Sequence, residues 1–185
     1  DPAALDARSI ALSWSTVQIF RSLGLWSQLQ ARAAPIKHIH ISSAGFFGVT
    51  RLDARDFGQQ AMGYVIEYHL LLKALLDHAG RQPGIEIVTP ARVDAVEQQQ
   101  DRLRVDYQIN QQEKTLHSGL VVVADGANSP LRHKLGITVD RVDYRQSALI
   151  ANVRITENSA GWAYERFTEG GPLALLPLPG KRYAV

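Results

Sequence analysis

The spacing of apolar residues predicts two helices near the start of the chain. Apolar positions over residues 15–23 fall at roughly helical intervals, and Gly24 followed by Leu25 is typical of a left-handed helix end with its hydrophobic contact. A second, shorter helix is expected to run to about residue 33, before Pro35.

The pattern then changes to the period of strands. Isoleucines alternate with histidines over 36–42, as in a half-buried strand, and 45–52 is a second strand-like run followed by a polar loop over 53–60. These two strands are expected to form a hairpin. Apolar residues 64–66 lead into a leucine-rich helix over 70–79, which is apolar on more than one face and is therefore expected to be buried.

Four short strands are predicted next, at 85–89, 92–97, 103–109 and 120–124. The last of them is an unbroken apolar run, which is typical of a central strand covered on both faces. A short helix should follow, with Ser129 as N-cap, Pro130 at its first position and Gly136 as its stop, before Ile137 packs back.

The chain becomes strand-rich again after Asp140, with strands expected at 149–155, 162–168 and 173–178. The predicted fold class is therefore α/β with α+β character, and a domain boundary is expected between residues 138 and 145. The chain starts without Met and stops as a strand begins, so we expect it to be an internal fragment of a longer protein.

Composition excludes several kinds of protein. With 185 residues, 45% of them hydrophobic, the chain can bury a core, and its formal charge of +2 shows no basic run suited to nucleic acid. No cysteine is present, and no apolar stretch approaches a membrane span. His38 and His40 are a close pair without a third ligand, so we expect no metal site and interpret them as one polar strand face. A cytoplasmic location is the default expectation.

The most informative stretch is the turn after the predicted strand 120–124. Asp125 would stand at the carboxyl end of this strand, where ligands bind in open α/β sheets, and Gly126 allows a tight turn into the helix capped by Ser129. Asp125 can accept hydrogen bonds from ribose or ribityl hydroxyls, while Arg132 and the helix start favour a pyrophosphate. A strand, Asp-Gly turn and capped helix also occur in many α/β proteins without a cofactor.

The wider pattern resembles the class A flavoprotein monooxygenases of ubiquinone biosynthesis, which have the p-hydroxybenzoate hydroxylase fold. Asp125, Gly126, Ser129 and Arg132 match the Asp-Gly motif of that family position by position. The resemblance extends over essentially the whole chain through three further stretches, which are residues 6–13, residues 63–68 and residues 163–178.

The resemblance implies an FAD-binding fold with the start of a β-rich substrate domain, divided into residues 1–140 and 141–185. It implies cofactor-binding roles for Arg8, Glu67, Val93, Asp125, Gly126 and Arg132, and a substrate pocket with Leu175 and Pro177. Taken alone, Arg8 is equally a solvated arginine, Glu67 a helix-dipole partner, Val93 a core valine, and the strand around Leu175 a plain core strand.

The FAD site is incomplete in these 185 residues, because the Gly-rich fingerprint and a later Gly-Asp segment of the family are absent. The fragment alone should therefore bind FAD weakly or not at all and be inactive. The intact enzyme should use NADPH or NADH, FAD and dioxygen to hydroxylate a polyprenyl phenol, without a catalytic triad or metal.

Such a substrate implies peripheral contact with the inner membrane, and homo-oligomers or assemblies with other ubiquinone-pathway enzymes stay open. Two alternatives remain: an FAD-dependent reductase or dehydrogenase of the same fold, and a non-catalytic α/β binding module.

Overall fold

The computed structural model describes residues 8–156 and 161–185, which form two compact units. Unit 1 contains the described residues up to Ile85 together with those from Ser147 on, and unit 2 is Glu86–Gln146. The expected boundary between residues 138 and 145 lies close to the second junction. The first 85 residues, however, belong with the C-terminal segment rather than with unit 2, so the functional division into 1–140 and 141–185 stays a prediction.

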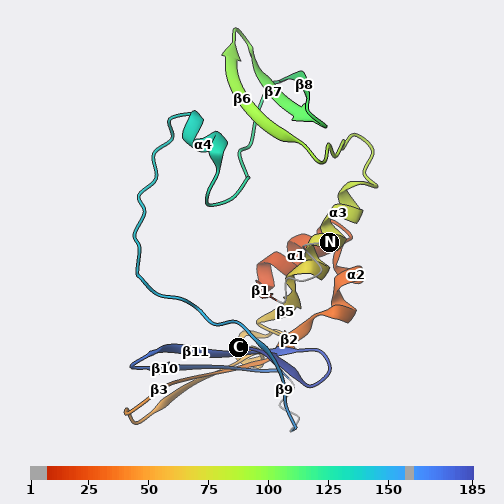
Figure 1. Cartoon of the computed structure of the whole chain (residues 1–185). Helices are drawn as coiled ribbons and strands as arrows, with labels where there is room; N and C mark the ends of the chain where they lie inside the picture. The colour runs from red at the N-terminus through yellow and green to blue at the C-terminus, as the bar shows by residue number, and fades with distance from the viewer. Residues whose placement is uncertain (1–7, 157–160) are drawn as a thin grey trace. The chain divides into compact units, whose positions relative to one another are not determined.

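Unit 1 begins with a three-stranded antiparallel sheet and three helices (Figure 1). The strand order is β1-β5-β2, so β5 is central. The elements are β1 (Ser9–Ser13), α1 (Trp14–Ser22), α2 (Trp26–Leu29), the 3₁₀ helix η2 (Gln30–Arg32), β2 (Ala34–Ile36), β5 (Gly63–Glu67) and α3 (Tyr68–Ala79). The two predicted early helices and the helix after residues 64–66 are thereby confirmed.

The first helix ends as its sequence predicts. Gly24 has a φ of 70°, and the amide of Leu25 donates to the carbonyl of Phe20 at 2.8 Å, which closes a Schellman motif. The Leu25 side chain is completely buried, in a cluster that includes Val17 and Ile66. This cluster packs the helices against the central strand β5.

Close packing of β1 on β5 leaves no room for a side chain at residue 63. Gly63 lies so near the carbonyl oxygen of Leu12 that an added Cβ would fall under 3.0 Å from it, which forces the backbones of β1 and β5 to move.

The prediction that the leucine-rich helix is buried is wrong for most of α3: Leu71 is buried, but Leu75 and Leu76 are 37% and 50% exposed. Only one side of α3 meets β5 and α2 in the part of the chain described.

A six-stranded mixed sheet completes unit 1. Its order is β4-β3-β10-β11-β12-β9, where β3 and β10 are parallel and every other pair is antiparallel. The strands are β3 (His38–Ser43), β4 (Val49–Asp53), β9 (Asn152–Arg154), β10 (Trp162–Thr168), β11 (Gly171–Leu178) and β12 (Arg182–Ala184), and the 3₁₀ helix η3 (Ala54–Phe57) follows β4. The predicted hairpin is confirmed as β3–β4, whereas the predicted strand 149–155 shrinks to β9.

The two faces of this sheet differ. One face packs Ala163, Leu178 and Ala184 against Ile36 and Val65, and so joins the two sheets in a second core cluster. The opposite face carries a row of rings, because residues paired across strands point to the same side. This row consists of His38, His40, Trp162, Tyr164 and Tyr183.

Unit 2 contains an antiparallel meander, β6 (Arg92–Gln99), β7 (Arg102–Ile109) and β8 (Gln112–Ser118), and the helix α4 (Pro130–Lys134). Strands β6 and β7 confirm two predictions, while β8 was missed because its residues are mostly polar and exposed. The predicted strand 85–89 is wrong, since those residues form no ladder.

The predicted central strand 120–124 is also wrong for this structure. The segment belongs to no strand or helix, and Leu120 and Val122 are 75% and 77% exposed. A strand exists only through hydrogen bonds to a neighbour, and no described strand lies beside this segment. Its apolar residues are therefore of the kind that proteins bury, but the rest of unit 2 does not cover them.

Candidate functional site

The adjacent ends of β1 and β5 bring together two of the predicted cofactor residues. Ser9 pairs with Glu67 across the two strands, and the amide of Tyr68 donates to the carbonyl of Arg8 at 2.9 Å. The Arg8 guanidinium lies 5.5 Å from the centre of the Tyr68 ring, which is cation–π distance. Residues almost sixty positions apart in sequence thus share one edge of unit 1.

A residue that sequence reasoning missed completes this group. Arg182 of β12 donates from Nη1 to Oε1 of Glu67 at 2.9 Å, and its Nε donates to the carbonyl of Pro179. The Glu67 side chain is 17% exposed and that of Arg182 is 36% exposed. No sequence motif marks a single arginine after a Pro-Gly turn, so only the fold shows that it meets Glu67.

We call Arg8, Glu67 and Arg182 the edge cluster. Glu67 is the residue before α3, yet its side chain makes no capping hydrogen bond to that helix. This does not test the interpretation of Glu67 as a helix-dipole partner, because the dipole interaction requires no hydrogen bond. Its carboxylate is held by a guanidinium from the six-stranded sheet, which links the two sheets of unit 1.

The Asp-Gly turn of unit 2 has the local geometry that its residues predict. Gly126 has a φ of 91°, which favours glycine, and Ser129 is buried with its Oγ accepting from the amide of Arg132 at 2.9 Å. The helix ends in a Schellman motif at Gly136, but Ile137 is 54% exposed, so its expected packing contact is wrong.

Arg132 has a clear structural role in this turn. Its Nη2 donates to the carbonyl of Ala127 at 2.6 Å and its Nη1 to that of Gly126 at 3.4 Å. The guanidinium therefore fixes the loop that carries Asp125, whose side chain is exposed. Contact of Arg132 with a pyrophosphate stays a prediction.

Val93 and Asp125 line the same cleft of unit 2, about 690 Å³ in volume. Its walls are residues 91–94, Val105, residues 121–125 and part of α4. Val93 is 40% exposed, so its interpretation as a core valine is wrong for this unit. The cleft is mainly apolar and is also lined by the carboxylates of Asp94 and Asp125, a combination suited to a flat ring carrying hydroxyl groups.

Leu175 and Pro177, the predicted substrate residues, lie on the ring-bearing face of the six-stranded sheet. Leu175 pairs with Tyr164 and Pro177 with Tyr183. Leu175 is partly exposed and Pro177 is buried. Around these two residues the face is therefore apolar and aromatic, as a phenol pocket requires, but its use as one stays a prediction.

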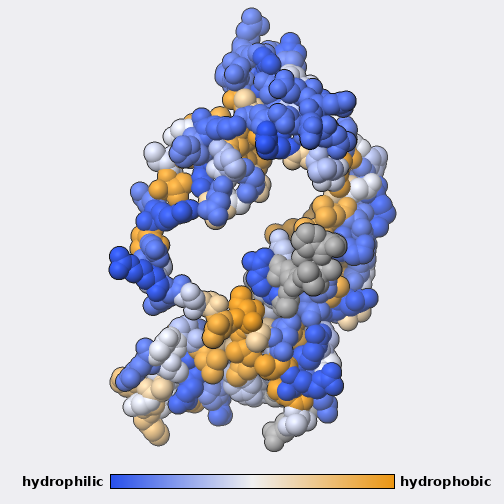
Figure 2. Space-filling view, in the orientation of Figure 1, coloured by the Kyte–Doolittle hydropathy of each residue, from blue (hydrophilic) through white to orange (hydrophobic). Residues whose placement is uncertain are grey.

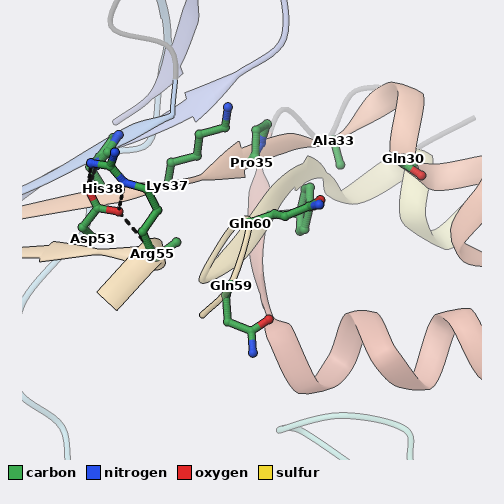
Figure 3. Close-up of a pocket in the computed structure, with 11 residues that line it drawn as sticks. Gln30, Ala33, Pro35, Lys37, His38, Asp53, Arg55, Gln59 and Gln60 are labelled. Atoms are coloured by element: carbon green, nitrogen blue, oxygen red, sulfur yellow. Dashed lines mark hydrogen bonds and ion pairs between the residues drawn. The ribbon is translucent and has the colours of Figure 1, made fainter. Parts of the chain in front are cut away.

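A cavity of unit 1, about 710 Å³, lies where η2, β2 and the end of β4 meet (Figure 3). Arg55 donates to both carboxylate oxygens of Asp53, at 3.0 and 2.7 Å, and these bonds hold the pKa of Asp53 below its usual range. His38 lies 3.1 Å from Asp53 and stacks on Trp162 with ring centres 4.5 Å apart. This polar cluster was not predicted from the sequence.

The histidines show no arrangement for a metal. His38 and His40 lie on one strand face, against Trp162 and Tyr164 respectively. Within residues 8–156 and 161–185, no group of three or more His, Cys, Asp or Glu side chains could hold an ion. In the same ranges no helix is long and apolar enough to cross a membrane.

The residues present fit parts of an FAD molecule. The left-handed Gly126 leaves open space beside the Asp125 turn, and the cleft lined by Asp125 has a volume of about 690 Å³. The edge cluster offers two guanidinium groups and a carboxylate, which match phosphate and hydroxyl groups. Both units thus offer chemistry suited to the cofactor.

Comparison with known proteins identifies the class. Residues 2–184 match the family profile of the FAD binding domain, and the chain belongs to that family. Its fold is that of flavin-dependent monooxygenases: p-nitrophenol 4-monooxygenase PnpA from Pseudomonas putida DLL-E4 superposes with a TM-score of 0.79 at 19% identity, over 97% of this chain and 47% of that one. HpxO from Klebsiella pneumoniae complexed with FAD and uric acid superposes with a TM-score of 0.70 at 19% identity, over 95% of this chain and 45% of that one. The predicted fold class is thereby confirmed.

Sequence relatives are more specific. The ubiquinone hydroxylase UbiL of Rhodospirillum rubrum is 33% identical over 190 residues, which cover 98% of this chain and 43% of UbiL. The 3-demethoxyubiquinol 3-hydroxylase of Escherichia coli is 28% identical over 94% of this chain and 44% of that protein. The resemblance to ubiquinone-pathway flavoprotein hydroxylases is confirmed, and the chain spans less than half the length of these relatives. This assignment rests on the match over the whole chain and does not depend on the strand 120–124 or on Asp125, whose side chain is exposed.

Proposed function

We propose that the protein is an FAD-dependent monooxygenase of ubiquinone biosynthesis that hydroxylates a phenol carrying a polyprenyl chain, with NADPH or NADH as reductant. The match to a ubiquinone hydroxylase over 98% of the chain supports this proposal most strongly. The motifs most resemble those of 2-octaprenyl-6-methoxyphenol hydroxylase. Bound FAD would supply the oxygen chemistry, so the side chains need only bind, orient and exclude water.

The edge cluster would hold polar parts of the cofactor. The Arg8 guanidinium lies over the Tyr68 ring, and Glu67 could accept from hydroxyl groups through Oε2, since Arg182 donates to Oε1. In unit 2, Asp125 would accept from hydroxyl groups of the cofactor, and Arg132 keeps its loop in place. Leu175 and Pro177 would lie against the apolar substrate.

The unpaired segment 120–124 has a simple explanation within this proposal. Its apolar residues would become a central strand once strands from outside these 185 residues lie on both sides of it. Asp125 would then stand at the carboxyl end of that strand, beside a nucleotide crevice. The same argument makes the chain alone a weak FAD binder, because a Gly-rich phosphate loop is not among its residues.

The test uses the full-length protein that contains this chain. It should purify with a flavin absorption spectrum, and NADPH or NADH should be consumed with dioxygen to give a hydroxylated phenol. Asp125→Asn should weaken FAD binding about tenfold or more, since a charge-assisted hydrogen bond is worth about 1.5–3 kcal/mol. The matched control is Asp140→Asn, at another exposed aspartate of unit 2, which should change nothing.

The alternatives give different results. A reductase or dehydrogenase would oxidise the nicotinamide and reduce an acceptor equally well without dioxygen. A non-catalytic module would show no flavin spectrum, and it would fold cooperatively as the 185-residue chain. Equal FAD affinity for Asp125→Asn and the native protein would contradict the proposed role of Asp125. It would not contradict the monooxygenase activity, which is tested by the hydroxylated product.

A further inference from the structure

The tip of the β3–β4 hairpin exposes two adjacent phenylalanines. Phe46 is 80% exposed and Phe47 is completely exposed, while Gly45 and Gly48 on either side have φ values of 76° and 108°. The turn between β3 and β4 is thereby shaped by glycines that bracket the aromatic pair. Water-exposed phenyl rings are unfavourable, so such a pair on a turn indicates a surface that meets something apolar.

Apolar residues of the neighbouring hairpin widen this tip. Phe167 pairs with Ser43, and its carbonyl accepts from the amide of Ala44 at 2.8 Å, which ties the end of β10 to the turn. Phe167 and Leu173 are 48% and 46% exposed, and Val49 at the start of β4 is 53% exposed. We call Phe46, Phe47, Val49, Phe167 and Leu173 the aromatic tip. Figure 2 shows pale orange, apolar atoms at the lower left, where β3 ends in Figure 1.

The charges around the aromatic tip favour an anionic surface. No acidic residue occurs from residue 38 to residue 52. Arg51 and Arg166, both exposed, lie behind the tip on the same sheet, and Arg166 also donates to the hydroxyl of Ser42. Glu169, in the turn after β10, is the one exposed carboxylate of the two turns. Phenyl rings in front of arginines match a bilayer, whose acyl region is apolar and whose headgroups are anionic.

We propose that the aromatic tip inserts into the interface of a bilayer containing anionic lipid, with Arg51 and Arg166 at the headgroups. This rests on the proposed function, since a polyprenyl phenol dissolves in the bilayer and has to be taken from it. The tip would hold the ring-bearing sheet against the membrane from which the substrate comes. Binding should grow with the apolar area inserted and with the anionic lipid content.

The test uses the full-length protein and vesicles of phosphatidylcholine with or without phosphatidylglycerol. Replacing both rings (Phe46→Ser with Phe47→Ser) should weaken vesicle binding at least about tenfold, as expected when two phenyl rings leave an apolar environment. The matched control is Phe57→Ser on η3, a phenylalanine that is 60% exposed elsewhere in unit 1, and it should bind as the native protein does. Arg51→Gln with Arg166→Gln should weaken binding only to the anionic vesicles.

The absence of cysteine from these 185 residues allows insertion to be measured with site-specific labels. Phe47→Cys and Phe57→Cys, each in the full-length protein with any cysteine outside these residues replaced by serine, provide a single site for an environment-sensitive dye. The dye at position 47 should shift to the blue when vesicles are added, and the dye at position 57 should not. Equal vesicle binding by the double phenylalanine variant, or a dye at position 47 that is already shielded without vesicles by the rest of the protein or a second copy, would overturn the proposal. The flavin spectrum, recorded on the same samples, separates this outcome from failure of the proposed function.

Discussion

The ion pair between Glu67 and Arg182 should contribute measurably to the stability of unit 1. The two atoms lie 2.9 Å apart, and the Glu67 side chain is only 17% exposed. A hydrogen bond to a charged group contributes about 1.5–3 kcal/mol, whereas an exposed ion pair contributes about 0–1 kcal/mol. Because Arg182 is 36% exposed and in contact with water, we expect a coupling energy of about 1–2 kcal/mol.

A double-mutant cycle measures this coupling. The variants are Glu67→Gln, Arg182→Met and the two combined, each unfolded with urea. All three tryptophans, Trp14, Trp26 and Trp162, belong to unit 1, so their fluorescence follows the unfolding of that unit and not of unit 2. Each single change should lower the free energy of unfolding, and the double change should cost about 1–2 kcal/mol less than the sum.

Arg154→Met is the matched control. Arg154 is exposed and lies directly opposite Arg182 across β9 and β12, so removing it should be neutral or slightly stabilising, since like charges across a sheet repel. A coupling energy below about 0.3 kcal/mol, within the usual error of additivity, would refute the reasoning. Arg182→Lys should keep part of the coupling through its charge but not the arginine's fork geometry.

Three further predictions concern stability. Gly63→Ala should destabilise unit 1 by about 1–3 kcal/mol in urea unfolding, because its Cβ would clash with a β1 carbonyl, while Gly170→Ala should be nearly neutral; equal effects would contradict this. Ser129→Ala should cost about 1 kcal/mol, seen as faster amide exchange in α4, and unchanged exchange would show that the cap is dispensable. Arg55 lowers the pKa of Asp53, so their contact stabilises the fold above about pH 4, and this stabilisation is lost as the pH falls further. Asp53→Asn should therefore reduce the loss of stability in acid, measured by acid unfolding. An unchanged acid transition in this variant would show that the contact is not its source.

The sequence predicted correctly those elements whose signals lie within the element itself. The helix that ends at Gly24, the β3–β4 hairpin and the capped helix at Ser129 each contain their own signals, so the sequence predicts them correctly. The errors fall where burial depends on partners. The segment 120–124 is apolar enough for a central strand, but pairing requires neighbours that the pattern cannot supply.

The candidate site divides in the same way. The shape of the Asp-Gly turn follows from Gly126 and Ser129, so it was predictable. The edge cluster was only half predictable, because Arg182 reaches Glu67 through sheet topology that joins residues 115 positions apart. No periodicity or motif encodes a contact at that separation.

The parallel pairing of β3 with β10 has a consequence for how the protein is made. Contacts such as that between Arg166 and Ser42 join residues 124 positions apart, with the whole of unit 2 between them. At about 5–20 residues per second, a ribosome needs roughly 6–25 s to synthesise that stretch. During this interval β3 of the nascent chain has no partner on the side that later pairs with β10, so its backbone N–H and C=O groups on that side are open. Such an edge can bind chaperones and can start aggregation.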